Sequence, residues 1–238
     1  MRASRVVGAA VFMTLSYMKE PLAFVSDLII PLVIFMVVQL GTGRGVESLL
    51  GILVAVAWSS GSFALARKLA TYRVWRLMDM FVASPLKPIE FAVASALAHL
   101  AVIIAPATVV LAIMALTVGV SPVSLPLIAA SILLAWFAGT AFGLYVYGKL
   151  ADPMRVSSAA SLLNLLLILL PPVIYPVPIL PREIQLVSTL IPTVALKLVA
   201  QHLVGVPTEV PLLLPAAATA AYTALFTTLA LRQRLTVE

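Results

Sequence analysis

The chain has 238 residues, of which 63% are hydrophobic and only 10% are charged, and its formal net charge is +6. A soluble globular domain is about half apolar and about one-quarter charged, so this composition excludes a soluble fold. Because the chain has no cysteine, it has no disulfide framework, no thiolate metal site and no cysteine nucleophile. The composition therefore predicts an integral membrane protein with almost no soluble part.

The first segment, residues 2–20, precedes the long apolar runs. It places Val6, Ala10, Met13 and Tyr17 on one helical stripe. This spacing favours an amphipathic helix that lies in the membrane interface. The segment lacks the small-residue cleavage pattern of a signal peptide, so we expect it to be retained.

Six apolar stretches follow, each long enough to cross a bilayer. A spanning helix needs about 20 apolar residues, because about 30 Å of hydrocarbon is crossed at about 1.5 Å per residue. The predicted spans lie near residues 22–40, 46–66, 91–118, 125–148, 156–176 and 212–231. The sequence therefore predicts an all-α integral membrane protein, with residues 1–238 forming a single transmembrane domain.

Basic residues fall almost entirely in every second segment between the spans, and these segments lie on the same side of the membrane. Lysine and arginine are enriched on the cytoplasmic side of membrane proteins. If the N-terminus is cytoplasmic, 12 of the 15 basic residues lie inside: Arg2, Arg5, Lys19, Arg67, Lys68, Arg73, Arg76, Lys87, Lys149, Arg155, Arg232 and Arg234. The bias predicts a multi-pass protein of the cell membrane with both termini in the cytoplasm. It also accounts for the positive net charge without a nucleic-acid partner.

The longest predicted inside segment is residues 67–90. Apolar residues recur at helical spacing from Val74 to Phe81, whereas Arg73, Arg76 and Asp79 share the opposite side. The pattern predicts an amphipathic helix with a charged outer face. Two interpretations stay open: a surface helix that extends its arginines to lipid phosphates, or a docking helix for a soluble partner.

The second predicted inside loop, residues 149–155, is short. Asp152 followed by Pro153 is typical of a helix N-cap with proline at the first helical position. Arg155 then falls in the first helical turn, where the helix dipole disfavours a positive charge. This arrangement indicates an external partner or a lipid phosphate near Arg155.

On the predicted outer side, residues 170–181 hold five prolines, and proline breaks a helix because it removes a backbone donor. The outer segment that follows, residues 177–211, contains Glu183, Lys197 and His202, which would be costly in lipid, and Pro192 divides it. We therefore expect re-entrant or interfacial half-helices between the fifth and sixth spans.

Polar side chains inside the spans are further candidates. Asp27 and His99 are ionisable, and a charge buried in a bilayer costs at least about 2.5 kcal/mol, so an ion or proton relay competes with structural polar packing. Ser157, Ser161 and Asn164 lie at i, i+4 and i+7 on the fifth span. Such residues either line a substrate pathway or let helices approach closely and hydrogen-bond.

Other short motifs give little support for catalysis. The sequence contains no GxSxG, HExxH or GxxxxGK[ST] motif, so we expect no catalytic, nucleotide or metal site on this chain. Gly139 and Gly143 form a GxxxG pattern in the fourth span, which is a signal of close helix packing.

Together, these features resemble the membrane permease of a type-two ATP-binding-cassette (ABC) exporter. The resemblance covers nearly the whole chain and rests on four features. They are the interfacial helix at residues 2–20, Pro31 inside the first span, the sequence Val82-Ala83-Ser84-Pro85-Leu86 at the end of the amphipathic helix, and the outer stretch from Tyr175-Pro176 to Leu180-Pro181, which is followed by Ile191-Pro192.

The resemblance implies a six-span subunit that pairs with a second permease copy or a homologue, with a substrate pathway at the seam between them. Separate ABC-type ATPase subunits would bind ATP and magnesium, and no cofactor is expected on this chain. The segment 67–90 would hold the coupling helix, whose Arg73, Arg76 and Asp79 face the ATPase. Asp152 and Arg155 would form a smaller second contact.

A runner-up from another functional class is an ion- or proton-coupled secondary transporter that uses Asp27 and His99. This alternative predicts activity that follows a proton or sodium gradient without ATP. It also predicts loss of function when Asp27 becomes Asn.

Overall fold

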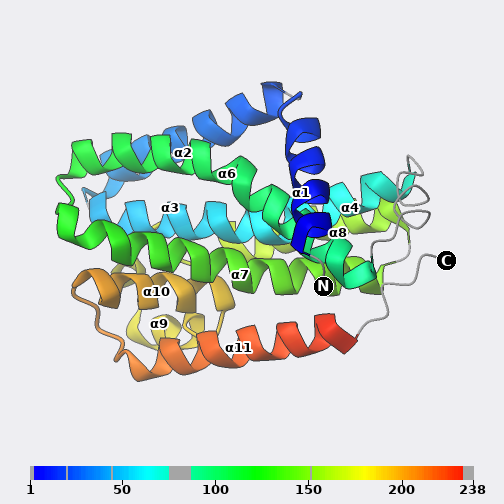
Figure 1. Ribbon diagram of the computed structural model, residues 1–238. Coiled ribbons are helices and arrows are strands. Elements are labelled where there is room, and N and C mark those ends of the chain that lie inside the picture. The colour runs from blue at the N-terminus through cyan, green and yellow to red at the C-terminus, as the bar shows by residue number, and fades with distance from the viewer. Residues whose placement is uncertain (1–2, 20, 44, 75–86, 151, 233–238) are drawn as a thin grey trace.

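The computed structural model describes residues 3–19, 21–43, 45–74, 87–150 and 152–232, with only the backbone described for a few helical residues, Asp27 among them. In this part of the chain every regular element is helical (Figure 1). The α-helices are α1 (Ala3–Tyr17), α2 (Pro21–Thr42), α3 (Gly45–Ser59), α4 (Leu65–Val74), α6 (Pro88–Val118), α7 (Leu125–Lys149), α8 (Pro153–Asn164), α9 (Arg182–Ser188), α10 (Pro192–Val204) and α11 (Leu213–Arg232).

Short helical segments of other types join some of these helices. The π-helix η1 (Ser60–Ala64) links α3 to α4, so residues 45–74 form one long central helix. A second π-helix, η3 (Leu165–Leu169), continues α8. The 3₁₀ turns η2 (Pro122–Ser124) and η4 (Val177–Ile179) precede α7 and α9.

Four helices among the described residues are long and apolar enough to cross a membrane: Gly45–Val74, Ile89–Val118, Pro122–Lys149 and Leu213–Arg232. The helices α9 and α10 are bent by 103° relative to each other, as in a broken span or a re-entrant loop, and would make a fifth span if counted as one. Ile29–Thr42 and Met154–Leu169 are shorter apolar helices. The all-helical membrane architecture is therefore confirmed, whereas the count of six spans and the re-entrant outer segment stay predictions.

Glycines bring the central helix against α7. A Cβ atom added to Gly143 would lie 2.5 Å from the Ser62 carbonyl oxygen, and one added to Gly139 would lie 2.7 Å from the Trp58 carbonyl oxygen. No side chain larger than hydrogen fits at these distances. The GxxxG pattern is therefore confirmed as a close-packing signal. The Trp58 ring meets Phe142 of α7 at the same crossing, with ring centres 5.6 Å apart.

The central helix extends beyond its predicted end at residue 66. It continues to Val74 because Leu69 and Tyr72 are buried in an apolar cluster that also contains Met13 of α1 and Val156 of α8. The first part of the predicted inside segment is therefore a continuation of the span. The remainder of the predicted coupling helix, with Arg76 and Asp79, lies outside the described residues.

Helix α1 runs across the long helices rather than along them (Figure 1) and packs against α6. Its buried side chains are Val6, Ala9 and Met13. The predicted stripe is confirmed at Val6 and Met13, with Ala9 buried more deeply than Ala10. Phe12 is exposed, so the exposed side of α1 is not uniformly polar.

One end of the bundle gathers the end of α4, the end of α7 and the start of α8, together with α1 and the end of α11 (Figure 1). We call it the α4–α8 end. The turn between α2 and α3, the turn between α6 and α7, and the end of α10 lie at the opposite end (Figure 1). Residues of both predicted inside loops, from α4 and from α8, thus lie at one end.

Candidate functional site

Arg73 lies in the last turn of α4, at the α4–α8 end. Its guanidinium carbon is 5.3 Å from the centre of the Tyr147 ring on α7, and Tyr147 is buried. A cation over an aromatic ring within about 6 Å is stabilised by about 0.5–2 kcal/mol. The contact therefore fastens the helix that leads into residues 75–86 to the body of the bundle.

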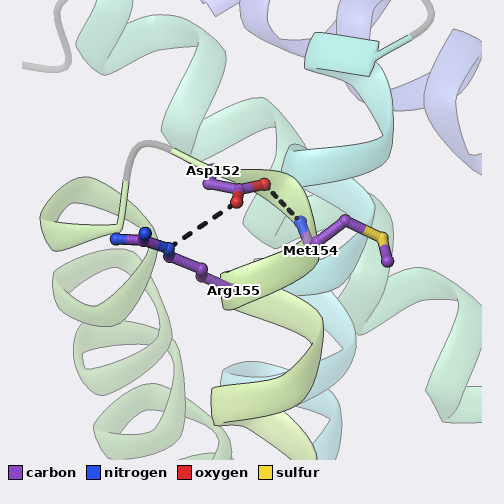
Figure 2. A network of polar contacts seen from close by, with 3 residues as sticks. All are labelled: Asp152, Met154 and Arg155. Atoms are coloured by element: carbon purple, nitrogen blue, oxygen red, sulfur yellow. Dashed lines mark hydrogen bonds and ion pairs between the residues drawn. The ribbon is translucent and has the colours of Figure 1, made fainter.

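Asp152 begins α8 as its N-cap, as predicted (Figure 2). Asp152 Oδ1 accepts a hydrogen bond from the Met154 backbone N–H at 2.9 Å, and Asp152 Oδ2 lies 3.7 Å from Arg155 Nε. The carboxylate thus offsets the unfavourable position of Arg155 near the helix N-terminus. The Arg155 and Asp152 side chains are 80% and 50% exposed, so the pair contributes no more than about 1 kcal/mol. Arg155 stays accessible to a partner.

The structure brings three of the predicted docking residues to the same end. Arg73 contacts α7 just before the loop that leads to Asp152 and Arg155, and α4 packs against α8. Arg76 and Asp79 lie outside the described residues, so their place on this face stays a prediction.

The three polar residues of the predicted pathway on α8 do not share one environment. Ser157 and Ser161 are exposed, and the Ser161 hydroxyl donates to the Ser157 carbonyl oxygen at 3.1 Å. Asn164 is half-buried, and its Oδ1 accepts a hydrogen bond from the Ser59 hydroxyl at 3.2 Å. The two serines therefore lie on a face turned away from the bundle, and Asn164 ties α8 to the central helix.

His99 is buried on α6, where its ring packs edge-on against Tyr17 with ring centres 5.9 Å apart. Lys68 Nζ lies 5.4 Å from the centre of the Tyr17 ring and 5.6 Å from that of Tyr72. The adjoining cavity has a volume of about 10 Å³, which is about the room that one water molecule needs. His99 thus belongs to a packed cluster that joins α1, α4 and α6. The Asp27 side chain is not among those described.

A buried lysine near the opposite end has a role that the sequence did not reveal. Lys197 of α10 is 0% exposed, and its Nζ donates to the carbonyl oxygens of Pro172 at 3.0 Å and Tyr175 at 2.7 Å. The Thr193 hydroxyl donates to the Leu167 carbonyl oxygen. These bonds fasten α10 to η3 and to the proline-rich turn after it. The available signal was the single lysine of α10, which lies within an apolar run and must find partners when it is buried.

No candidate metal centre is found within the described ranges, where no three His, Asp or Glu residues lie close enough together to hold an ion. The described residues thus form an accessible charged face at the α4–α8 end and a polar face on α8. Near the opposite end, the buried Lys197 joins α10 to the proline-rich turn.

Comparison with known families gives a match over residues 33–232 to the family described as ABC-2 family transporter protein. A comparison with curated proteins gives no match. The matched range runs from within α2 to the end of α11 and includes Arg73, Asp152, Arg155 and Lys197. The chain therefore belongs to the ABC-2 family of transporter proteins, and it is a multi-pass membrane permease.

Proposed function

We propose that this chain is the permease subunit of an ATP-driven exporter, that it forms a substrate pathway as a dimer, and that separate ATPase subunits drive it from the cytoplasm. The match to the ABC-2 transporter family carries the proposal. ABC transport needs a nucleotide-binding motor, and the sequence contains no GxxxxGK[ST] phosphate loop. ATP and magnesium would therefore be bound by the partner chains.

The geometry of the α4–α8 end supports docking of such a motor. Arg155 and Asp152 are exposed at the start of α8, and Arg73 holds the end of α4 over Tyr147. A force applied to residues 75–86 would reach α4 and α7 together through this ring contact. In the proposal Arg76 and Asp79 extend the same charged face toward the ATPase.

The exposed face of α8 supports a pathway at the seam between two permease chains. Ser157 and Ser161 are on a face of α8 that the other described residues leave exposed. Lipid tails offer no partners for the hydrogen-bonding capacity that these hydroxyl groups do not use within α8. A second permease copy or a homologue over this face would enclose the serines and leave Asn164 at their edge. ATP-driven closure of the ATPase pair would then rock the two permeases apart.

The gradient-driven alternative would use Asp27 and His99. The contacts of His99 with Tyr17, in a cluster with Lys68, favour a role in packing α1 against α6. This alternative predicts that Asp27→Asn abolishes transport driven by a proton or sodium gradient. The exporter proposal predicts transport that stops when ATP hydrolysis stops, whatever the gradient.

The docking face is tested by reversing the charge of Arg73 and Arg76. We expect the double variant Arg73→Glu, Arg76→Glu to retain about tenfold less ATPase during purification in nanodiscs. Groups of the partner that attract the two arginines would repel the two glutamates. Arg232→Glu is the matched control, since Arg232 is an exposed basic residue at the same end. Equal retention by the wild type and the double variant, with both inserted in the membrane, would contradict the assigned face.

A further inference from the structure

A cavity of about 420 Å³ lies at the end of the bundle opposite the α4–α8 end. Three segments that are distant in the sequence form it: residues 45–47 at the start of α3, residues 119–121 with Ser124 before α7, and residues 204–207 after α10. Sites for small molecules have volumes of about 300–1,000 Å³. The cavity is therefore large enough for a ligand, and it is separate from the docking face and from the polar face of α8.

Backbone turns rather than side chains shape two of its walls. Gly119 has a φ of +73° and Gly205 a φ of +80°, a conformation that L side chains rarely adopt. A Cβ atom at either position would meet nothing within 4 Å. The two turns therefore require glycine for their conformation and leave the adjoining space unfilled.

The chemistry of the lining indicates the class of ligand. Glu47, in the first turn of α3, is the ionisable side chain among the described lining residues, and Ser121 and Ser124 add hydroxyl groups. Most of the other lining side chains are valine or proline. Binding sites of this kind combine apolar walls with a few polar groups that fix the orientation of the ligand. A carboxylate among apolar walls suits an ammonium group that carries apolar substituents.

We propose that this cavity binds a small organic cation of the ammonium class, with the Glu47 carboxylate as its counter-ion. Glu47 also interacts electrostatically with Lys197, which holds the carbonyl groups of Pro172 and Tyr175. A carboxylate has two oxygens with about four acceptor sites, so it can face the lysine and a ligand at the same time.

The absence of native cysteine allows a single-cysteine test on the purified chain in nanodiscs. Ser124→Cys places a thiol in the cavity at a half-buried residue whose hydroxyl caps no helix. Val123→Cys is the matched control, because Val123 is the adjacent residue, is 82% exposed and does not line the cavity. Each thiol is modified with a trimethylammonium and with a sulfonate methanethiosulfonate reagent, and intact-mass spectra give the rates.

We expect the ratio of the cationic to the anionic rate to be about fivefold higher at position 124 than at position 123, because one nearby carboxylate attracts the cation and repels the anion. Glu47→Gln should abolish this difference and Glu47→Asp should keep it. Tetraethylammonium should slow modification of Ser124→Cys by a neutral reagent and leave Val123→Cys unaffected. Equal ratios at the two positions, a preference that survives Glu47→Gln, or a lack of protection would each overturn the proposal. No ATPase takes part, so the result is independent of the proposed transport function.

Discussion

The Ser59 hydroxyl donates a hydrogen bond to Asn164 Oδ1 at 3.2 Å, and each of these residues immediately precedes a π-helical segment. The bond therefore joins the central helix to α8 at the two points where the helices depart from regular α geometry. Such π segments within α-helices occur frequently at functional sites. In the proposed exporter, this bond would carry movement from the start of α8 to the middle of the central helix.

The Ser59–Asn164 bond can be tested with a double-mutant cycle. Ser59→Ala and Asn164→Ala should each lower the free energy of unfolding by about 1 kcal/mol, because each removes one hydrogen bond. The double variant should lose little more than either single variant, since both remove the same bond. Thermal unfolding in nanodiscs measures the loss in stability of each variant. Strictly additive losses would contradict a direct interaction, and Ser161→Ala is a control whose hydroxyl bonds only within α8.

Gly143→Ala should destabilise the chain, because the added Cβ would lie 2.5 Å from the Ser62 carbonyl oxygen. Overpacking of this kind costs about 1–3 kcal/mol. Gly8→Ala is the matched control: Gly8 lies on α1 with nothing within 4 Å of an added Cβ, so its substitution should have no harmful effect. Thermal unfolding of the two variants compares them directly, and equal midpoints would show that the helix crossing is looser than described.

Lys197→Met should loosen the proline-rich turn, because the carbonyl groups of Pro172 and Tyr175 would lose their buried donor. Each unpaired buried group costs about 1–3 kcal/mol. We expect amide hydrogen exchange at residues 173–175 to become about tenfold faster, since local opening sets that rate. Lys149→Met, an exposed lysine at the other end, is the control. Unchanged exchange in the Lys197 variant would show that Lys197 does not hold the proline-rich turn in place.

Tyr147→Leu should weaken retention of the ATPase, because Arg73 would lose its contact with the aromatic ring. The guanidinium carbon of Arg73 lies 5.3 Å from the centre of this ring. Tyr147→Phe keeps the ring and should retain the partner at close to the wild-type level, since the interaction is with the ring face. Quantitative mass spectrometry of the purified complexes compares the two. Equal losses in both variants would assign the effect to the tyrosine hydroxyl instead.

Local sequence rules predicted the features that depend on a few neighbouring residues. The stripe at Val6 and Met13, the Asp152 N-cap and the close packing at Gly143 all follow from spacing or from residue type. The sharp break near Pro192 was also predicted, because proline cannot continue a helix. These signals required no knowledge of which helices are neighbours.

The remaining features depend on contacts between segments far apart in the sequence. The central helix passes residue 66 because Leu69 and Tyr72 find apolar partners on α1 and α8. Lys197 was predicted only as an outer residue that would be costly in lipid, because its partners are backbone carbonyls whose position is set by the turn after η3. Glu47 stood out in no motif, since its cavity is formed by three separate segments.

The most direct test of the central claim is native mass spectrometry of the complex extracted from its own membrane into nanodiscs. The proposed function predicts two permease chains bound to ATPase chains that carry the GxxxxGK[ST] phosphate loop. A folded permease that is reproducibly extracted into nanodiscs without any such ATPase would contradict the exporter proposal. That result would favour the gradient-driven carrier, with Asp27 as the next residue to test.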